Sequence, residues 1–491
     1  MEFLDPEEKR QRSIRLFLGY SLLISIVVFL TFILSFVLQG FSLFTTSTEV
    51  RNGLLFIDSK PVSADITING KQQKRTDARF VVPEGTYDVQ LTANGYRDWQ
   101  KTINVIGGSV TYHIYPRLFP TTIATKTTVP LPQPPKLWTQ SPDRQWIIVG
   151  PKAALPTMQM IDTTKPNESP VDIQLPETVF NAQDMVNAQL DVIEWSSDNR
   201  HFLLQKSFAD GSRQYVMINR EKPEESYNLT TKLNLSPQGS VKLRDKKFDQ
   251  YYILDASTKL LRKATLAAGI EPVILADGVI AYTPYGADIV LYATESGALT
   301  GTYAVRILDN TTNYLLQPIA STKDVLLDVA RYDGDWMFVA GSGSQDETAI
   351  YVNPLQSSNN TDSTGALRSQ LKLPLRAPRY ASFSDNARFI ALQNADSFTV
   401  YDAELQTIYS YKSPATLPKE GADWMDGFRL QTVSDSSVQV FEYDGSNYQI
   451  LGNAANGYEP FYNPDYTTMF SVTQQSPPGG GVQVSSLTAS Q

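Results

Sequence analysis

The chain has 491 residues, of which 51 are acidic and 42 basic, and its formal net charge is −9. It contains no cysteine and only two histidines, His113 and His201, which excludes disulfides and zinc–thiolate sites and disfavours a multi-histidine metal site. The acidic balance argues against nucleic acid and against anionic lipid headgroups as partners, because both are bound through clustered Lys and Arg.

An uncharged apolar run, residues 16–38, follows a tail that contains Lys9, Arg10, Arg12 and Arg15. A helix of this length spans about 35 Å, enough to cross a hydrocarbon core of about 30 Å. The first basic residue beyond the run is Arg51, so the positive-inside rule places the tail, residues 1–15, in the cytoplasm and the rest outside. A cleaved signal peptide is the alternative, but its apolar region is shorter, about 7–15 residues. We therefore predict a signal-anchor: one transmembrane helix in the cell membrane.

Short apolar segments separated by turn residues predict a small all-β domain over residues 51–118. Tyr87, Val89 and Leu91 alternate with polar residues, as expected of a strand with one buried face. The stretch contains Gly53-Leu54-Leu55, Ala64-Asp65-Ile66, Asn69-Gly70, Pro83-Glu84-Gly85-Thr86-Tyr87, Asn94-Gly95-Tyr96 and Trp99. In these motifs it resembles the PEGA domain, a β-sandwich module of bacterial and archaeal surface proteins. The resemblance implies a binding or spacer role outside the membrane and no catalysis.

Residues 119–136 are rich in proline, with Pro120, Pro130, Pro132, Pro134 and Pro135. Proline-rich segments are stiff and extended, at about 3.1 Å per residue. We predict that this segment is a linker that marks a domain boundary and holds the following domain away from the bilayer.

A degenerate unit recurs over residues 137–490: an aromatic residue, small polar residues, an Asp, and then an apolar strand. The clearest copies are 137–150, 193–205, 381–393 and 460–472, and weaker ones lie at 241–243, 273–275, 326–328 and 422–424. A spacing of about 35–55 residues matches one four-stranded propeller blade, so we predict a β-propeller of seven or eight blades. We expect the strand-like tail, residues 482–487, to close the ring against the first blade.

The unit resembles the repeats of the Tol–Pal periplasmic propeller and of WD-like propellers. In the Tol-type repeat the turn reads tryptophan-Ser-Pro-Asp-Gly, and here the glycine position is assigned to Arg144, Asn199, Asn386 or Tyr466. The resemblance implies a fold and no particular function.

Few residues suggest chemistry. Trp138, Trp195 and Trp424 stand before their turns, where packing between blades is favoured over ligand stacking. The Asp-rich turns 333–335 and 443–446 are too short for the six to eight oxygens of a calcium loop, so we predict hairpin turns. His113 and His201 lie on expected strands, and no nucleophile elbow accompanies them. A catalytic pair of carboxylates from different blades stays open, because the sequence does not locate one.

These observations predict an all-β protein behind one transmembrane helix, with a sandwich domain, a linker and a propeller. They favour a non-enzymatic binding or scaffold protein of the prokaryotic cell envelope, whose propeller presents a protein- or glycan-binding face. No catalytic, cofactor or metal residue is assigned. A surface hydrolase or lyase acting on polysaccharide or peptidoglycan is the alternative. A sensor is disfavoured because a tail of about 15 residues cannot fold an effector domain.

Overall fold

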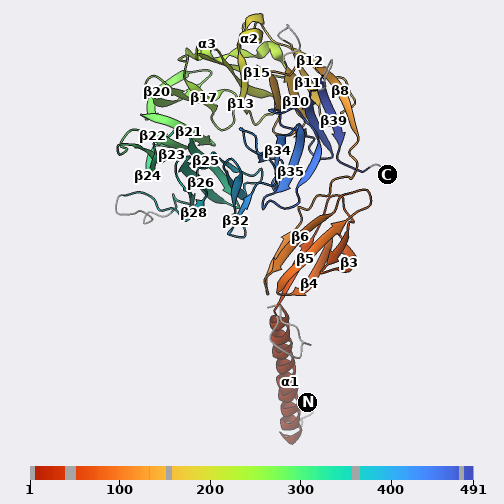
Figure 1. The fold of residues 1–491 in the computed structure, drawn as a ribbon. Helices are drawn as coiled ribbons and strands as arrows, with labels where there is room; N and C mark the ends of the chain where they lie inside the picture. The colour runs from red at the N-terminus through yellow and green to blue at the C-terminus, as the bar shows by residue number, and fades with distance from the viewer. Residues whose placement is uncertain are drawn as a thin grey trace, which may run out of the picture. The chain divides into compact units, whose positions relative to one another are not determined.

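The computed structural model describes residues 6–38, 51–131, 133–150, 157–356, 365–474 and 480–489 (Figure 1). They divide into two compact units, residues 1–122 with 489–491, and residues 123–488. Each unit is described by itself below.

The first unit begins with helix α1, Pro6–Leu38. Proline suits this first helical position because the N–H that it lacks would have no partner there. Within the described residues, one helix is long and apolar enough to cross a membrane: its segment Phe17–Leu34 has a mean hydropathy of 2.5 and side chains exposed throughout. The predicted apolar helix is confirmed, and it begins at Pro6 instead of residue 16.

Two sheets form the sandwich that follows. In the three-stranded sheet, β1 (Asn52–Ile57) pairs antiparallel with β4 (Ala78–Pro83) and parallel with β7 (Val110–His113). The four-stranded sheet has the order β3-β2-β5-β6, with bounds Lys71–Arg75, Asp65–Ile68, Gly85–Thr92 and Trp99–Val105. The turn at 83–85 therefore carries the chain from one sheet to the other. The core between the sheets includes Leu55, Ile66, Val89, Leu91 and Trp99.

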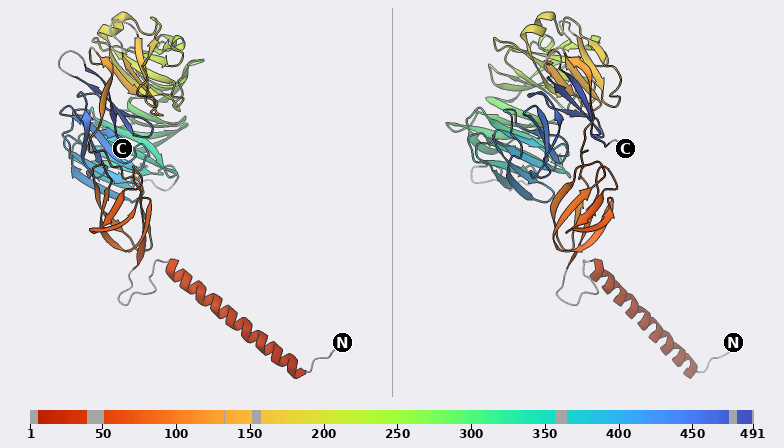
Figure 2. Two further views of the ribbon diagram at one scale, coloured as in Figure 1. Left: turned by 90° about the vertical axis from the view of Figure 1, so that its right-hand side faces the viewer. Right: turned by 45° about the vertical axis from the view of Figure 1, so that its right-hand side comes forward.

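The second unit contains eight four-stranded sheets within the described residues, arranged as the blades of a β-propeller (Figures 1 and 2). In chain order within each blade, blade one is Leu137–Gln140, Trp146–Gly150, Thr157–Asp162 and Val171–Gln174 (β9–β12); blade two is Gln189–Trp195, His201–Ser207, Arg213–Asn219 and Tyr227–Asn228 (β13–β16); blade three is Ser240–Leu243, Gln250–Asp255, Leu260–Thr265 and Gly269–Ala276 (β17–β20); and blade four is Val279–Tyr285, Ile289–Thr294, Thr302–Asp309 and Thr312–Ala320 (β21–β24).

Blade five is Val325–Tyr332, Asp335–Ser342, Glu347–Val352 and Leu371–Pro374 (β25–β28); blade six is Tyr380–Phe383, Phe389–Gln393, Ser397–Asp402 and Thr407–Lys412 (β29–β32); blade seven is Asp423–Trp424, Arg429–Ser434, Ser437–Glu442 and Gln449–Asn453 (β33–β36); and blade eight is Phe461–Tyr462, Thr468–Thr473 and Gly480–Ser486 (β37–β39), completed by β8, Thr125–Leu131. Helices α2 (Ala182–Asn187), α3 (Leu229–Leu233) and η1 (Pro223–Glu225) lie in connections.

The ring closes through a strand from the segment predicted to be a linker. β8 pairs antiparallel with β39, with Val129 opposite Val482, so residues 125–131 belong to blade eight. The prediction of a free linker over 119–136 is therefore wrong for this part, and the tail closes the ring on β8 instead of on the first blade. Proline is tolerated because β8 is an edge strand, where a missing N–H leaves no ladder bond unmade.

Seven of the eight repeat copies predicted from the sequence include the innermost strand of a blade. The copy at 273–275 is the exception: it lies on β20, the outermost strand of blade three, where Val273 and Ile274 are exposed. The innermost strand of blade four is β21, Val279–Tyr285, which lacks the aromatic-polar-Asp pattern. The apolar residues between blades form the cores, for example Ile148, Phe202, Leu204 and Val216 between blades one and two.

Substituting the closing strand should destabilise the propeller. Val129 is 4% exposed and packs with Ile147, Phe470 and Val482. In Val129→Asp an unpaired carboxylate replaces an apolar side chain there, so we expect a loss of roughly 3 kcal/mol or more in unfolding free energy.

Denaturant unfolding of the detergent-solubilised chain, followed by tryptophan fluorescence, measures this loss. Thr125→Asp is the matched control, because Thr125 lies on the same strand and is exposed. Equal midpoints for the two variants would mean that β8 does not close the ring.

Candidate functional site: the propeller channel and its loop faces

Short turns join the first and second strands of the blades at one end of the channel. In three of the clearest repeats, a Ser or Asn side chain accepts a hydrogen bond from the N–H that opens the second strand. The pairs are Trp146 N to Ser141 Oγ at 3.0 Å, Phe389 N to Ser384 Oγ at 3.0 Å, and Thr468 N to Asn463 Oδ1 at 2.9 Å. In each turn the backbone N–H of the same Ser or Asn donates to the carbonyl of the residue that opens the second strand, so two bonds fix the turn against its strand.

The left-handed position of these turns is occupied by residues other than glycine. Arg144, Asn199, Ala387 and Tyr466 have φ of 61°, 57°, 59° and 56°. The assignment of Asn386 to this position is therefore wrong by one residue. Asn386 instead takes the place of the turn aspartate, because its Oδ1 accepts from the Ser384 hydroxyl at 2.8 Å. A β-carbon in this conformation costs roughly 1–2 kcal/mol.

Arg144 connects the turns of four blades. From the turn of blade one, its guanidinium forms an ion pair with Asp385 of blade six and donates to the carbonyl of Met425 of blade seven at 3.2 Å. It also lies 4.6 Å from the ring centre of Tyr466 in blade eight. Because blades seven and eight separate blade one from blade six, this side chain ties together the turns on this side of the ring. Burial raises the pKa of Asp385, although the charge of Arg144 opposes the shift.

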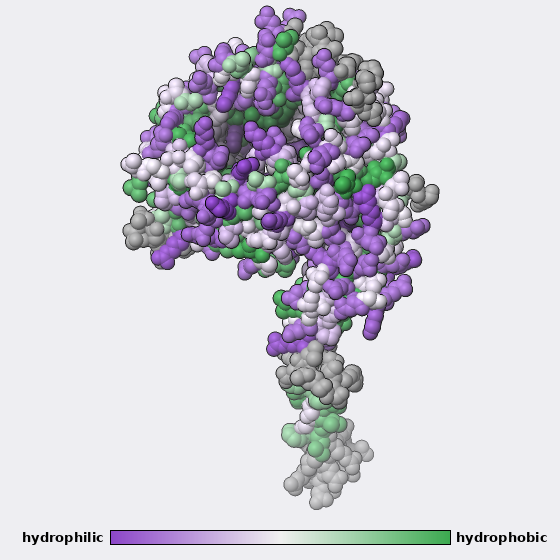
Figure 3. Space-filling view, viewed as in Figure 1, coloured by the Kyte–Doolittle hydropathy of each residue, from purple (hydrophilic) through white to green (hydrophobic). Residues whose placement is uncertain are grey.

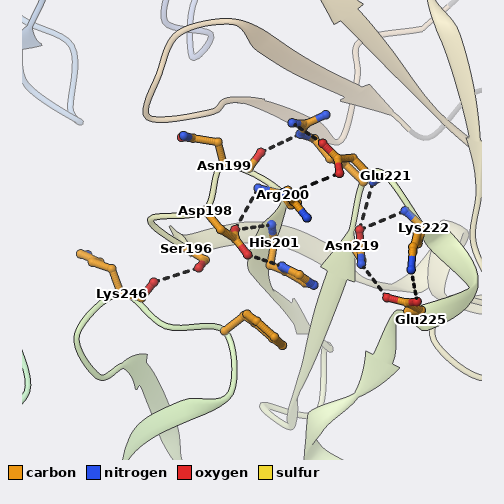
Figure 4. Close-up of polar contacts among 12 residues, drawn as sticks. Ser196, Asp198, Asn199, Arg200, His201, Asn219, Glu221, Lys222, Glu225 and Lys246 are labelled. Carbon is orange, nitrogen blue, oxygen red and sulfur yellow. Dashed lines mark hydrogen bonds and ion pairs between the residues drawn. The ribbon is translucent and has the colours of Figure 1, made fainter.

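His201 is held in a structural cluster at the turn of blade two (Figure 4). Its Nδ1 is hydrogen-bonded to Asp198 Oδ2 at 2.6 Å, and its ring stacks on Phe248 with centroids 4.0 Å apart. Burial would raise the pKa of Asp198, but hydrogen bonds from the Arg200 backbone and from His201 outweigh it, and the pKa is lowered. The imidazole ring thus helps to fix the turn against blade three, where the Lys246 backbone carbonyl accepts a hydrogen bond from the Ser196 hydroxyl at 2.9 Å. His113 lies on β7 of the sandwich.

Polar side chains bridge every blade junction, and the three tryptophans are among them. Trp195 donates to Thr139 at 2.9 Å, Trp424 to Ser382 at 3.1 Å, and Trp138 to the Glu459 carbonyl at 2.7 Å. The predicted packing of these rings between blades is confirmed by these contacts. The other junctions are bridged through Glu194 to the Leu243 N–H, Lys242 to the Tyr282 carbonyl, Thr283 to the Leu327 carbonyl, Asp328 to the Phe383 N–H, and Gln431 to the Pro460 carbonyl.

One carboxylate pair comes from different blades. Asp423 is the first residue of β33, the innermost strand of blade seven, and Glu459 lies two residues before β37 of blade eight. Both side chains are exposed to solvent, although protein atoms surround Glu459 on several sides. Burial, a hydrogen bond with Asp423 and the charge of Asp423 raise the pKa of Glu459 to about 9. Two carboxylates that interact in this way do not both ionise readily, so the pair favours the protonated form of Glu459.

Both Asp-rich turns have the predicted form. Tyr332 pairs with Asp335, so Asp333 and Gly334 make a two-residue hairpin between β25 and β26. In the other turn, Asp444 accepts from the Ser446 hydroxyl at 2.6 Å. Across the described residues, no group of three or more Asp, Glu and His side chains is placed to hold a metal ion.

A groove runs over blades four to six, on the face that carries the loops between second and third strands. It consists of two adjoining hollows of about 340 and 440 Å³ that share Asp346. Charges of both signs, amides and hydroxyls line it together with apolar and aromatic side chains. The polar residues are Gln317, Gln345, Asp346, Glu347, Lys372, Arg376, Ser397, Thr399, Ser410 and Lys412, and the others are Ala349, Pro374, Leu375, Phe398 and Tyr411. Its floor is fixed, since Thr399 donates to the Pro374 carbonyl at 2.7 Å and Gln317 to the Ala340 carbonyl at 3.0 Å. We refer to it as the blade 4–6 groove.

Comparison with known proteins identifies parts of the chain. Residues 52–121 match the family model described as the PEGA domain. A search of curated proteins finds no relative of the sequence.

Solved structures with a similar fold include the C-terminal WD40 domain of Sif2, at 12% identity and a TM-score of 0.48, covering 73% of this chain and 97% of that chain. The β-propeller domain of Cps50 (Swd1) from Myceliophteria thermophila is similar at 9% identity and 0.38, covering 67% and 99%. An oligogalacturonate lyase in complex with manganese is similar at 9% and 0.38, covering 74% and 98%. At these scores the likenesses carry no argument about what this chain does.

Replacing Ala387 by glycine should stabilise the propeller. The substitution removes the β-carbon from a residue with φ of 59° and deletes no other atom, so we expect a gain of about 1 kcal/mol in unfolding free energy. Ala381→Gly, in the extended strand β29, is the matched control and should lose about 0.5–1 kcal/mol. Thermal unfolding of the two variants measures both changes, and a loss of stability in Ala387→Gly would contradict the assignment of the turn.

The stability of the propeller should fall as the pH rises from about 5 to 9. The pKa values of Asp328 and Glu459 are raised to about 6 and about 9, chiefly by burial. The folded state therefore holds protons that the unfolded state has released, and their contribution is lost as the pH passes the folded pKa. Above pH 6 the decline is due to Glu459.

Unfolding midpoints across this pH range measure the effect. Glu459→Gln, which keeps a neutral side chain of the same shape, should flatten the decline between about pH 6 and 9. An unchanged slope in this variant would show that Glu459 is not protonated in the folded protein.

Proposed function

We propose that this chain, which carries a PEGA domain at residues 52–121 and an eight-bladed β-propeller, is a membrane-anchored binding protein of the prokaryotic cell envelope. In this proposal α1 spans the cell membrane with its N-terminus in the cytoplasm, and the two β units lie outside. The protein acts as a scaffold that holds a partner at the surface and catalyses no reaction.

The blade 4–6 groove carries the proposal. It is open, it extends over three blades, and its floor is fixed by side-chain hydrogen bonds between blades. Rigid floors lower the entropy cost of binding, since little has to be ordered when the partner arrives. Propeller loops that gather on one face form such sites without catalytic residues.

The chemistry of the groove favours a protein segment over a sugar. Amides, hydroxyls and charges of both signs match the main chain and the charged side chains of a peptide. Sugars are usually bound by stacking on open aromatic faces, but the Tyr411 ring is stacked on Phe398 at 5.4 Å and lies against Gly445. That arrangement leaves little ring surface for a glycan.

The apolar helix supports the anchoring part of the proposal. Its segment Phe17–Leu34 exposes its side chains, and burying 18 such residues in a bilayer removes a large apolar surface from water. The basic residues of the tail and the lack of any before Arg51 support the orientation.

The alternative of a hydrolase or lyase would have to use His201 or the Asp423–Glu459 pair. His201 is engaged in the blade-two turn, where it bonds to Asp198 and stacks on Phe248. Release of cleaved glycan or peptide that increases with time during incubation with the purified chain would favour the enzyme instead.

Crosslinking on intact cells tests the proposal. With a membrane-impermeant crosslinker and the full chain in its own membrane, we expect a protein partner to be captured through the propeller. Asp346→Lys and Ser410→Arg, both in the groove, should each lower its recovery about tenfold, as expected for loss of about 1.4 kcal/mol at a central contact.

Thr407→Arg is the matched control, since Thr407 lies on the same strand as Ser410, is exposed and does not line the groove. Equal capture by Ser410→Arg and Thr407→Arg would reject the groove. Capture that survives protease treatment of the partner but not glycosidase treatment would reject a protein partner. Absence of any crosslink outside, with crosslinking in opened cells, would reject the orientation.

A further inference from the structure

The two outer faces of the sandwich differ sharply in polarity. The four-stranded sheet turns polar residues outward, among them Thr86, Asp88, Gln90, Gln100 and Asn104. This is the alternation expected of an antiparallel sheet with one face in water. The three-stranded sheet breaks that rule, because most of its outward residues are apolar although its inward residues already fill the core.

The outward residues of the three-stranded sheet are adjacent in register. Leu54 of β1 lies opposite Val81 of β4 and Val110 of β7, and Phe56 lies opposite Arg79 and Tyr112. Val81, Val110 and Tyr112 are 70%, 47% and 51% exposed. We call Leu54, Phe56, Val81, Val110 and Tyr112 the apolar sheet face. Figure 3 shows apolar colour reaching the surface of the sandwich.

Two aromatic rings and an arginine lie side by side on the apolar sheet face. Phe56 and Tyr112 stack with centroids 5.0 Å apart, and the Arg79 guanidinium lies 5.3 Å from the Phe56 ring centre. No Asp or Glu occupies an outward position on these three strands. An aromatic pair with a phenolic hydroxyl and a flanking arginine is typical of groups that sit at the headgroup level of a bilayer.

The charge of the chain is unevenly distributed. Residues 51–122 contain nine Lys and Arg against six Asp and Glu, a net charge of +3. Residues 123–491 contain 29 basic and 40 acidic residues, a net charge of −11. The net negative charge that argues against anionic lipid as a partner thus belongs to the propeller unit, whereas the net charge of the sandwich is positive.

We propose that the apolar sheet face docks on the bilayer that α1 spans, with anionic headgroups as the chemical partner. This inference rests on the proposed anchoring of α1. Only 13 residues separate Leu38 from Asn52, so even a fully extended chain keeps β1 within roughly 50 Å of the helix end. The tether makes docking intramolecular, and a weak contact then suffices.

The charges favour the bilayer over a second copy of the chain as the occupant. Two sandwiches meeting through this face would bring two units of charge +3 together, and Arg79 would face Arg79 or apolar side chains. On an anionic bilayer the same charge is attractive. The acidic propeller is repelled by the same surface, so docking through the sandwich leaves the propeller free.

Lipid-borne quenchers test the inference. The full chain contains no cysteine, so Val110→Cys on the apolar sheet face and Gln100→Cys on the polar face each accept one fluorophore. In vesicles of equal parts phosphatidylglycerol and phosphatidylcholine with a nitroxide lipid, we expect the label at position 110 to be quenched at least about threefold more than the label at position 100. Adding Val81→Asp should abolish the difference, whereas Asn104→Asp, its control on the polar face, should not.

The outcomes separate docking from anchoring. Equal, weak quenching at both positions in a chain that floats with the vesicles overturns docking and leaves the anchor intact. A chain that does not float with the vesicles overturns both. Self-quenching of the label at position 110 that rises with the protein-to-lipid ratio overturns the bilayer in favour of a second copy. Undiminished quenching in vesicles of phosphatidylcholine alone overturns the role of anionic headgroups.

Discussion

The propeller depends on one strand pair, β8 with β39. The apolar cores lie between blades, so each blade is stable only while both neighbours are present, and the eighth junction needs a strand from before the first blade. Val129 and Val482 join Ile147, Val149 and Phe470 in the core that links blade eight to blade one. Two glycines permit the close approach of the strands: an added β-carbon on Gly481 would lie 2.6 Å from the Val129 carbonyl oxygen, and one on Gly480 would lie 2.1 Å from that of Thr473. Gly481 thus permits the β8–β39 pair that closes the ring, and Gly480 permits the pairing of β39 with β38 within blade eight.

The parts of the fold that could be predicted from the sequence are those whose signal is local. The apolar helix, the alternation of Tyr87, Val89 and Leu91, and the aromatic-polar-Asp turns each depend on neighbouring residues. β8 could not be predicted, because a proline within a segment is typical of a linker. Only its partner strand β39, which follows far later in the sequence, shows that the segment is an edge strand. β3 was not predicted either, because all five residues of its sequence KQQKR are exposed and polar and apolar residues do not alternate along it. The apolar triplet 273–275 was predicted to belong to an innermost strand, but it lies on β20, an outermost strand, where Val273 and Ile274 are exposed to solvent.

The site features that matter most are non-local, and none could have been assigned from the chain alone. Arg144 and Asp385 are 241 residues apart, and Asp423 meets Glu459 only because blades seven and eight are neighbours. The type of turn was predicted correctly, but in one turn the left-handed position was assigned one residue too early. Asn386 was preferred to Ala387 because asparagine adopts the left-handed conformation more often than alanine. Ala387 occupies the left-handed position because the Asn386 side-chain oxygen accepts the hydrogen bond from the Ser384 hydroxyl, which places Asn386 one residue earlier in the turn.

Ring closure also shortens the connections between the two units of the chain. β8 begins at Thr125, three residues after the sandwich unit ends at Thr122, so the proline-rich segment contributes almost no free length. β39 ends at Ser486, and residues 489–491 belong again to the sandwich unit, where the Ala489 N–H bonds to the Tyr96 hydroxyl at 3.0 Å. The chain thus passes between the two units twice, and both short connections leave the same end of one antiparallel strand pair, because Thr125 at the start of β8 lies opposite Ser485 near the end of β39.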